Sequence, residues 1–423
     1  MAVVSRVRWF PRRSPTTPVP VAVDPADFDP ADFTPALRTR LLILQPTPFC
    51  NIDCDYCYLP DRDSTSRMSL ATVRRAAERL RDDDLAGAQL TVVWHAGEPL
   101  TMPRAFYDDA IDAIDEVLGA RCEVTHSIQT NATLIDDAWC ELIRRRGIRI
   151  GVSVDGPAVL HDRHRRTRDG RGTHARVLRG MDLLRRHGIA FHAIAVVTPA
   201  TFEQVDAFVD FFERHGVHDL GCNYDEAEGP HAGSSLAGHE DEHAAFTARL
   251  LERCADGSTT LRVRELALAA GLIAQPHPRQ RWRGESWPDN AQTLPLALIS
   301  VAHNGDFSSF SPELLGQPST EYGGFVLGNV RQHGYLDGAR SDRFARLWSA
   351  IRRGIHACER DCAYFGYCGG GAPANKLYEN GDLASAQTLY CRTMVQRPFD
   401  AVLARLERDQ RAARGARETE LQS

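Results

Sequence analysis

Three cysteines lie within eight residues of one another near the start of the chain, at Cys50, Cys54 and Cys57. Three thiolates on such a short segment can hold three corners of a cubic iron–sulfur cluster, and the fourth iron then stays open to bind and activate a small molecule. Structural zinc usually has four ligands, and disulfides need cysteines in pairs. No histidine or fourth cysteine stands close to the trio in sequence. The spacing therefore favours an iron–sulfur cluster with one open position.

The segment before the cysteines indicates where they lie. Residues 41–44 form a short apolar run that is typical of a buried parallel strand. Pro46 and Pro48 end that strand, because proline cannot donate to its hydrogen-bond ladder. The cysteines then follow the carboxyl end of a strand, which is where α/β barrels bind their ligands.

Short apolar strands alternate with amphipathic helices from residue 38 to about residue 225. The expected strands are residues 41–44, 90–94, 122–129, a strand ending at 151–155, 192–198 and 220–224. The expected helices are residues 69–83, with Ser69 as N-cap, and residues 104–118, 136–146, 174–187 and 202–215. Strands separated by helices pair in parallel through right-handed crossovers. We therefore predict an α/β fold with a partial (β/α)6 TIM-like barrel in residues 38–225, open on one side.

The trio has the pattern Cys-x-x-x-Cys-x-Tyr-Cys, with Tyr56 directly before Cys57. This pattern resembles the signature of the radical S-adenosylmethionine (SAM) enzymes. The resemblance implies that the three cysteines hold a [4Fe–4S] cluster, that SAM chelates its fourth iron, and that Tyr56 belongs to the cofactor site. It also implies cleavage of SAM to a 5′-deoxyadenosyl radical, which takes a hydrogen from an unactivated carbon.

Further motifs at the ends of expected strands look like the SAM-contacting motifs of that family, with Ala96 where the family usually has glycine. The residues that match them are Gly97, Glu98, Gln129, Asn131, Ser153, Asp155 and Arg166. A carboxylate beside a glycine suits the amino group of SAM, so Glu98 and Gly97 are expected there. The resemblance implies that Gln129 and Asn131 lie near the ribose and carboxylate of SAM, and Arg166 near the carboxylate. The alternative for each motif is a polar residue that closes a tight turn.

A second group of cysteines, Cys358, Cys362, Cys368 and Cys391, is a closed set of four. Such a set suits either a zinc ribbon or a fully ligated [4Fe–4S] cluster, and the spacings fit paired zinc knuckles poorly. The spacings resemble the C-terminal SPASM domain of radical SAM peptide and protein maturases, which usually holds two auxiliary clusters. Cys358 and Cys362 are separated by three residues, where two are usual.

The chain departs from the SPASM pattern at positions that belong to the first auxiliary cluster. Phe310 and Ala372 stand where the family has cysteines, and no cysteine lies between Cys254 and Cys358. The four cysteines that remain match the second cluster. We therefore predict one auxiliary [4Fe–4S] cluster.

The regions outside the predicted barrel complete the expected domain organisation. Residues 1–37 are expected to form an extended N-terminal arm, with a disordered tail as the alternative. Residues 226–295, helical over 243–274, either border the substrate as a bridge or form a plain linker. Residues 296–395 are expected to be a small SPASM-like (twitch-like) Fe–S domain that begins with a hairpin turning at Asn304-Gly305. Residues 396–423 are expected to be a terminal helix and tail.

Three stretches narrow the class of enzyme: the lead-in to the trio, Thr-Pro-Phe-Cys-Asn-Ile-Asp-Cys, and residues 310–316 and 368–376. They resemble one subgroup of maturases of ribosomally made peptides (RiPP maturases), which act on glycine-rich precursors and form three-residue cyclophanes. The resemblance implies that a Cβ hydrogen is abstracted and that the carbon bonds to an aromatic ring carbon two residues earlier. One electron and one proton then leave, and the auxiliary cluster is the expected electron acceptor.

The proton acceptor stays open. Asp225, Glu226, His303 and Glu313 lie on expected strand ends or loops that could face the cavity, but each is more often solvated or structural than a base. Two other functions also stay open. A thioether-forming (sactipeptide-type) or sulfatase-type radical SAM/SPASM maturase usually keeps the cysteines that are missing here. A non-catalytic, zinc-binding peptide-recognition module leaves the Cys50 trio unexplained.

Composition limits the partners and the compartment. A net charge of −6 gives no reason to expect nucleic acid or an anionic membrane surface. No stretch approaches 18 apolar residues, and no apolar signal segment is present. Eleven cysteines without an export signal favour a reducing compartment, so we expect a cytoplasmic protein. The expected partners are a precursor peptide containing aromatic residues and an electron donor such as flavodoxin or ferredoxin.

Overall fold

The computed structural model describes residues 24–422 apart from residues 230, 232, 258 and 276. Its centre is a ten-stranded sheet. In spatial order the strands are β10 (Arg262–Val263), β9 (Asp219–Tyr224), β8 (Phe191–Val197), β6 (Arg149–Ser153), β5 (Glu123–Thr130), β4 (Ala86–Trp94), β2 (Thr39–Leu44), β13 (Leu298–Val301), β14 (Asp306–Ser309) and β15 (Gly328–Asn329). The strands from β10 to β13 pair in parallel, and β13, β14 and β15 pair antiparallel.

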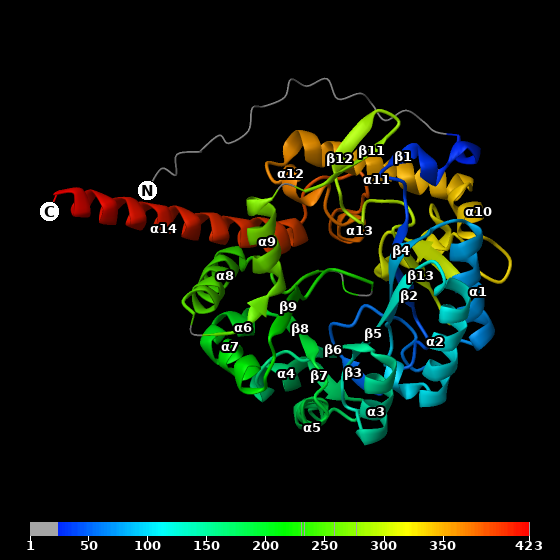
Figure 1. Ribbon diagram of the computed structural model, residues 1–423, viewed down its shortest axis with the longest axis horizontal. Coiled ribbons are helices and arrows are strands. Elements are labelled where there is room, and N and C mark those ends of the chain that lie inside the picture. The colour runs from blue at the N-terminus through cyan, green and yellow to red at the C-terminus, as the bar shows by residue number, and fades with distance from the viewer. Residues whose placement is uncertain (1–23, 230, 232, 258, 276, 423) are drawn as a thin grey trace.

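The six strands predicted for the barrel are β2, β4, β5, β6, β8 and β9, and the predicted α/β fold is confirmed. Helices lie on the outer side of the curved sheet (Figure 1). They are α1 (Leu70–Asp82), α2 (Arg104–Leu118), α3 (Asp137–Arg146), α4 (Ala158–His164), α5 (His174–Arg186), α6 (Pro199–Phe202), α7 (Val205–Arg214), α8 (Glu240–Ala255) and α9 (Arg264–Ala274). This arrangement brings the carboxyl ends of the parallel strands to one rim.

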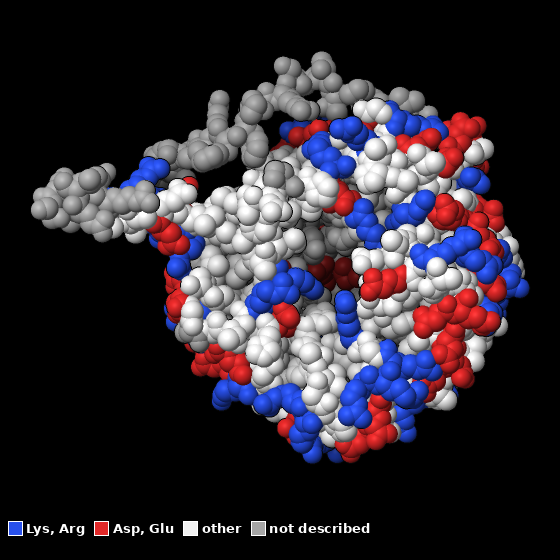
Figure 2. Space-filling view, in the orientation of Figure 1, with Lys and Arg blue, Asp and Glu red and all other residues white. Residues whose placement is uncertain are grey.

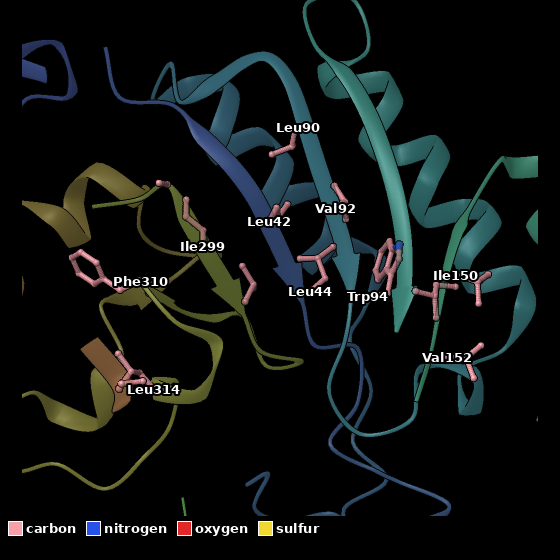
Figure 3. Packing of buried hydrophobic residues seen from close by; sticks show 14 of the residues in the cluster. Leu42, Leu44, Leu90, Val92, Trp94, Ile150, Val152, Ile299, Phe310 and Leu314 are labelled. Atoms are coloured by element: carbon pink, nitrogen blue, oxygen red, sulfur yellow. The ribbon is translucent and has the colours of Figure 1, made fainter. Parts of the chain in front are cut away.

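Local sequence signals explain the helix starts and the core. Ser69 caps α1 by accepting from the backbone N–H of Thr72 at 3.1 Å, as its residue type predicts. Leu44 of β2 and Trp94 of β4 are completely buried between the sheet and the outer helices (Figure 3). Burying such side chains stabilises the fold by roughly 1.5–3 kcal/mol each.

The structure departs from the predicted elements in three places. A short helix that was not predicted, α6, precedes the helix predicted over residues 202–215, which is present as α7. The helical region expected over 243–274 is α8 and α9 with strand β10 between them. A two-stranded sheet, β3 (Ile52–Cys54) with β7 (Arg165–Thr167), was not predicted. Strands of two or three residues are too short to show an apolar period, so no sequence pattern indicates them.

The C-terminal part of the chain continues the same sheet. The predicted hairpin is confirmed as β13 and β14, with Gly305 in its turn at φ 94°. Strand β13 pairs in parallel with β2, so the hairpin extends the barrel sheet at its edge. The helices that follow are α10 (Tyr335–Ala339), α11 (Asp342–Asp361), α12 (Phe365–Cys368) and α13 (Pro373–Asn380).

The two ends of the described chain differ. Residues 25–27 and 30–32 form 3₁₀ turns, and β1 (Phe33–Thr34) pairs with β11 (Arg279–Trp282), itself paired with β12 (Glu285–Pro288). The described part of the predicted arm therefore packs on the protein, and residues 1–23 lie outside the described residues. The predicted terminal helix is present as α14 (Arg397–Gln422), which runs away from the rest of the molecule (Figure 1). Among the described helices, none combines the length and apolar character that crossing a membrane requires.

Candidate active site between two cysteine groups

The Cys50 trio lies past the carboxyl end of β2, as predicted, and part of it belongs to the small β3–β7 sheet. Cys54 is the last residue of β3 and pairs with Arg165 of β7. Burial raises the pKa of the Cys54 thiol to about 12, and burial and the charge of Glu98 raise that of Cys50 to about 12. The thiols of Cys50 and Cys57 raise the pKa of Cys54 further, so the three sulfurs lie near one another. Thiolates gathered in this way need a cationic partner, and the iron of a cluster supplies one.

A buried ion pair fixes the loop that carries the trio. Arg165 donates from Nε and Nη2 to the two oxygens of Asp155, at 2.9 and 3.0 Å. Tyr56, inside the trio, donates to the same carboxylate at 2.5 Å, and the guanidinium of Arg165 lies over its ring. The backbone N–H of Val196 also donates to Asp155. The sequence predicted that Asp155 and Tyr56 belong to the cofactor site. In the structure both contact Arg165, a residue that the sequence motifs did not indicate.

Gly97 and Glu98 close the rim beside the trio. Gly97 has φ 57°, and a Cβ there would lie 2.5 Å from the carbonyl oxygens of both Thr47 and Phe49, so no other residue fits. The Glu98 carboxylate is buried and accepts from Thr130 Oγ1, the N–H of Asn131 and the N–H of Leu100 at 2.7–2.9 Å. Burial raises the pKa of Glu98 to about 7, against the lowering effect of these hydrogen bonds. Glu98 therefore holds the end of β5 in place.

Polar side chains at the ends of β5 and β6 lie close together. Gln129 donates to Ser153 Oγ at 2.9 Å, and both are partly buried. Asn131 donates to Asn51 Oδ1 at 2.9 Å, and its amide lies 3.9 Å from Cys50 Sγ. A Cβ at Gly151 would lie 2.1 Å from Gln129 Oε1, so a glycine in β6 makes room for these groups.

Arg166 does not join this group. It is exposed and donates to the carbonyl oxygen of Asp162, because neighbouring residues of a strand point to opposite faces and Arg165 takes the buried one. Arg168 has a role that no motif indicated: its guanidinium donates to the carbonyl oxygens of Cys50 and Arg62.

The second cysteine group is brought together from α11, α12 and the turn before α14. Cys362 interacts electrostatically with Cys358 and Cys391, and Cys368 interacts with all three. Burial raises the pKa of the thiol of Cys358, Cys362 and Cys368, in the last case to about 12. The thiolates of these four cysteines would repel one another, and a cationic metal group bound by all four would neutralise their charge. Within the described chain, no group of three or more His, Cys, Asp or Glu side chains is placed to hold a single metal ion.

The positions where the SPASM pattern lacks cysteines belong to an apolar core. Phe310 is completely buried and stacks on Phe344 and Trp348, with ring centroids 5.9 and 6.0 Å apart. Ala372 is also buried. Aromatic rings fill the space around Phe310, and this packing is consistent with a single set of auxiliary cysteines.

Carboxylates gather between the two cysteine groups. Glu226 and Glu228 follow β9 and hydrogen-bond each other, and Glu313 follows β14. Burial raises the pKa of Glu226 to about 7, while burial and the charges of Glu313 and Glu226 hold the pKa of Glu228 well above its usual range. Burial also raises the pKa of Glu313. We call these three residues the carboxylate group. Figure 2 shows the molecule hollowed at its centre, with acidic side chains deep in the hollow.

Contacts tie the carboxylate group to both cysteine groups. A Cβ at Gly229 would lie 2.5 Å from the carbonyl oxygen of Tyr58, directly after Cys57, so the segment after Glu228 packs on the Cys50 loop. On the other side, Asn375 of α13 donates to Glu226 at 2.5 Å. The hydroxyl oxygen of Tyr58 is buried and has no hydrogen-bond partner among the described residues.

Of the four residues considered as proton acceptors, the structure brings two together and leaves two apart. Glu226 and Glu313 belong to the carboxylate group. Asp225 instead accepts from the backbone N–H of Ser235, and His303 lies in the turn between β13 and β14. Glu228 was not predicted, because a Glu two residues from another Glu in a loop resembles any solvated acidic stretch.

Comparison of the sequence with known proteins identifies a family. Residues 44–212 match the Radical SAM superfamily. The chain is 36% identical to an uncharacterised protein of Synechocystis over 87% of its own length and 92% of the relative. It is 24% identical to the serine-type anaerobic sulfatase-maturating enzyme of Bacteroides thetaiotaomicron, over 82% of this chain and 85% of the relative.

Solved structures share the fold. Native anSMEcpe with bound AdoMet and the Cp18Cys peptide superposes with a TM-score of 0.71 at 19% identity, over 89% of this chain and 99% of the other. Streptococcus suis SuiB bound to its precursor peptide SuiA superposes with a TM-score of 0.58 at 17% identity, over 84% of this chain and 76% of the other. At these identities the likeness concerns the fold alone.

Proposed function

The chain belongs to the radical SAM superfamily, whose members use a [4Fe–4S] cluster and SAM, and from this premise we propose that it matures a ribosomally made peptide by joining two of its side chains. The bond proposed is between a Cβ carbon and an aromatic ring carbon two residues earlier, which closes a three-residue cyclophane. The observation that carries the proposal is the carboxylate group, which lies between two sets of cysteines and contacts the segments that hold both.

Forming such a bond requires the enzyme to remove a hydrogen atom, an electron and a proton from the peptide. The Cβ atom loses one hydrogen atom, and the ring must lose one electron and one proton to regain its aromaticity, so two hydrogens leave per crosslink. When bound at the Cys50 trio, the cluster and SAM supply the radical that removes the first hydrogen atom. The remaining electron and proton need acceptors close together.

The chain's own residues match those two needs. Cys358, Cys362, Cys368 and Cys391 would hold an auxiliary [4Fe–4S] cluster as the electron acceptor. Glu226 takes the proton, because a carboxylate whose pKa lies near 7 is a suitable base at neutral pH. Glu228, whose pKa is held well above its usual range by burial and by the charges of Glu313 and Glu226, is the hydrogen-bond partner of Glu226.

Residues around the Cys50 trio position the cosubstrate and exclude water. Gln129 and Ser153 present polar atoms at the strand ends, where the ribose and carboxylate of SAM would lie. The Asp155–Arg165 pair keeps Tyr56 and the trio in one conformation. Such rigidity supports radical chemistry, since a displaced loop would admit water and misplace the target carbon.

The second candidate is a sulfatase-type maturase, which oxidises one side chain without a crosslink. The relative in Bacteroides thetaiotaomicron, aligned over 82% of this chain, favours it. The single set of four auxiliary thiols and the apolar stack at Phe310 favour the crosslinking reaction, because the pattern with two auxiliary clusters has a cysteine at that position.

A peptide assay separates the two functions. The enzyme, reconstituted without oxygen, is incubated with SAM, dithionite and a synthetic peptide that carries repeated aromatic-x-x triplets. Crosslinking predicts a loss of two hydrogens per triplet, no backbone fragments between the joined residues in tandem mass spectrometry, and no reaction with methoxyamine. A product that fragments throughout and reacts with methoxyamine carries an aldehyde and supports the sulfatase-type reaction instead.

A further inference from the structure

The only lysine of the chain occupies a buried position beside the second cysteine group. Lys376 is the single lysine among 50 basic residues, and all the others are arginine. It belongs to α13 and is only 2% exposed. Lysine is almost never buried this completely without a partner for its charge.

The ammonium group of Lys376 has two described partners. Nζ donates to the carbonyl oxygen of Gly354 at 2.9 Å and to Cys358 Sγ at 3.3 Å. No carboxylate forms an ion pair with it in the described part of the chain. The sulfur of Cys358 is therefore the anionic group that this charge can meet once the thiol has lost its proton.

The surroundings are shaped to admit the ammonium group. A Cβ at Gly354 would lie 3.0 Å from Nζ and 2.4 Å from the carbonyl oxygen of Leu383, so a side chain there would displace the lysine. An ammonium is a compact point charge with three donors, whereas a guanidinium is a wide planar fork. A chain that uses arginine elsewhere therefore has a steric reason to use lysine here.

A neutral hydrogen bond reaches the same set of cysteines from another side. Thr388 is buried, and its hydroxyl donates to Cys391 Sγ at 3.2 Å. The two contacts allow a direct comparison, because one brings a full positive charge to a ligand sulfur and the other brings only a hydrogen bond.

We propose that Lys376 is a positioning residue that stabilises the reduced form of the auxiliary cluster through Cys358, so that the cluster can accept an electron from the substrate. This inference rests on the proposed function, because it requires the auxiliary cluster. Hydrogen bonds and positive charge at ligand sulfurs favour the more negative, reduced form of an iron–sulfur cluster and raise its reduction potential.

The test isolates the auxiliary cluster by removing the other one. In full-length protein with Cys50→Ala, Cys54→Ala and Cys57→Ala, any cluster that remains belongs to the second cysteine group. Lys376→Met, Lys376→Arg and the matched control Thr388→Val are added to this background. Iron content is measured after anaerobic reconstitution, and the midpoint potential by redox titration followed by electron paramagnetic resonance.

Lys376→Met is expected to keep about four irons and to lower the reduced-to-oxidised ratio at the parent midpoint at least tenfold, equivalent to 59 mV for a one-electron couple. Lys376→Arg keeps the positive charge but not the compact shape of the ammonium, so it should recover only part of that shift, and Thr388→Val should change the ratio less than Lys376→Met does. If Lys376→Met loses its iron while Lys376→Arg keeps it, the positive charge is needed to hold the cluster, which also supports the inference.

Two results would overturn the inference alone. One is an unchanged midpoint in Lys376→Met with its irons retained, and the other is loss of iron in both Lys376 variants, which would indicate a purely steric role. A parent triple-alanine protein that binds no iron overturns the auxiliary cluster itself. That outcome counts against the proposed function, so the two failures are distinguishable.

Discussion

Asn375 of α13 and Glu226 at the end of β9 are 149 residues apart in sequence, yet the amide Nδ2 donates to Glu226 Oε2 at 2.5 Å. This contact joins the segment after the last strand of the barrel to the helix that lies between Cys368 and Cys391. It keeps one oxygen of Glu226 occupied and favours the ionised carboxylate, against the effect of burial. The contact therefore fixes the position of Glu226 relative to α13.

The base assignment predicts a separation of two activities. Glu226→Gln should reduce crosslinked product by about 10²- to 10⁴-fold, the usual contribution of a general base, while SAM cleavage continues. The ratio of 5′-deoxyadenosine to crosslinked peptide, measured by liquid chromatography and mass spectrometry, should rise accordingly. Asp225→Asn is the matched control, because Asp225 lies outside the carboxylate group and accepts from Ser235. Product formation at the parental rate in Glu226→Gln would remove Glu226 from the mechanism.

The raised pKa of Glu226 also predicts how stability depends on pH. Its pKa is about 7 in the folded protein, above its ordinary value of 4.5, so the folded state holds a proton that the unfolded state has released. The contribution of the Glu226 carboxyl group to the free energy of unfolding is greatest below about pH 4.5 and is lost as the pH rises through about 7. Between pH 6 and 8, Glu226→Gln should therefore lose less stability than the parent protein does. Anaerobic thermal unfolding of both proteins checks this, and parallel pH profiles would contradict it.

Loss of the buried Asp155–Arg165 ion pair should destabilise the protein far more than loss of the exposed side chain of Arg166. Removing one partner of a buried ion pair leaves an uncompensated charge and costs about 3–5 kcal/mol. Arg165→Met should thus lower the free energy of unfolding by that order and reduce the iron held by the Cys50 trio. Arg166→Met should change it by less than about 0.5 kcal/mol, since Arg166 is exposed. Equal effects in denaturant titrations would show that the pair does not hold the loop.

Gly97 should tolerate no side chain. In Gly97→Ala the new Cβ would meet two carbonyl oxygens at 2.5 Å, so we expect a loss of at least about 2 kcal/mol and weaker SAM binding. Gly147→Ala separates crowding from backbone strain, because Gly147 has a similar φ of 62° and no atom within 4 Å of a Cβ. That variant should lose only about 1 kcal/mol. Calorimetric titration with SAM and unfolding measurements compare the two, and a Gly97→Ala protein as stable as Gly147→Ala would refute the crowding argument.

Long apolar and amphipathic segments made most of the barrel predictable. The six strands follow apolar runs, and Ser69 caps α1 as its residue type indicates. The short sheet of β3 and β7 could not be predicted, because its pairing depends on the buried Asp155–Arg165 contact and not on a local pattern. Likewise, β13 joins β2 across more than 250 residues of sequence, and no periodicity reports such a pairing.

The residues of the candidate site also fall into those that could be predicted from the sequence and those that could not. Cysteines and motif residues were predictable because their chemistry restricts the residue type at each position. Glu228 and Lys376 acquire their roles only through tertiary contacts, since a glutamate or lysine is ordinary until it is buried beside a particular partner. Arg166 and Arg165 are adjacent and identical, and only the alternation of β7 decides which one is buried.

The central claim is that the Cys50 trio holds a cluster that cleaves SAM. Protein purified and reconstituted without oxygen, then given SAM and dithionite, should produce 5′-deoxyadenosine, and the Cys50→Ala, Cys54→Ala, Cys57→Ala protein should produce none. Absence of 5′-deoxyadenosine from reconstituted protein that holds its iron, or equal amounts from the triple variant, would contradict the account.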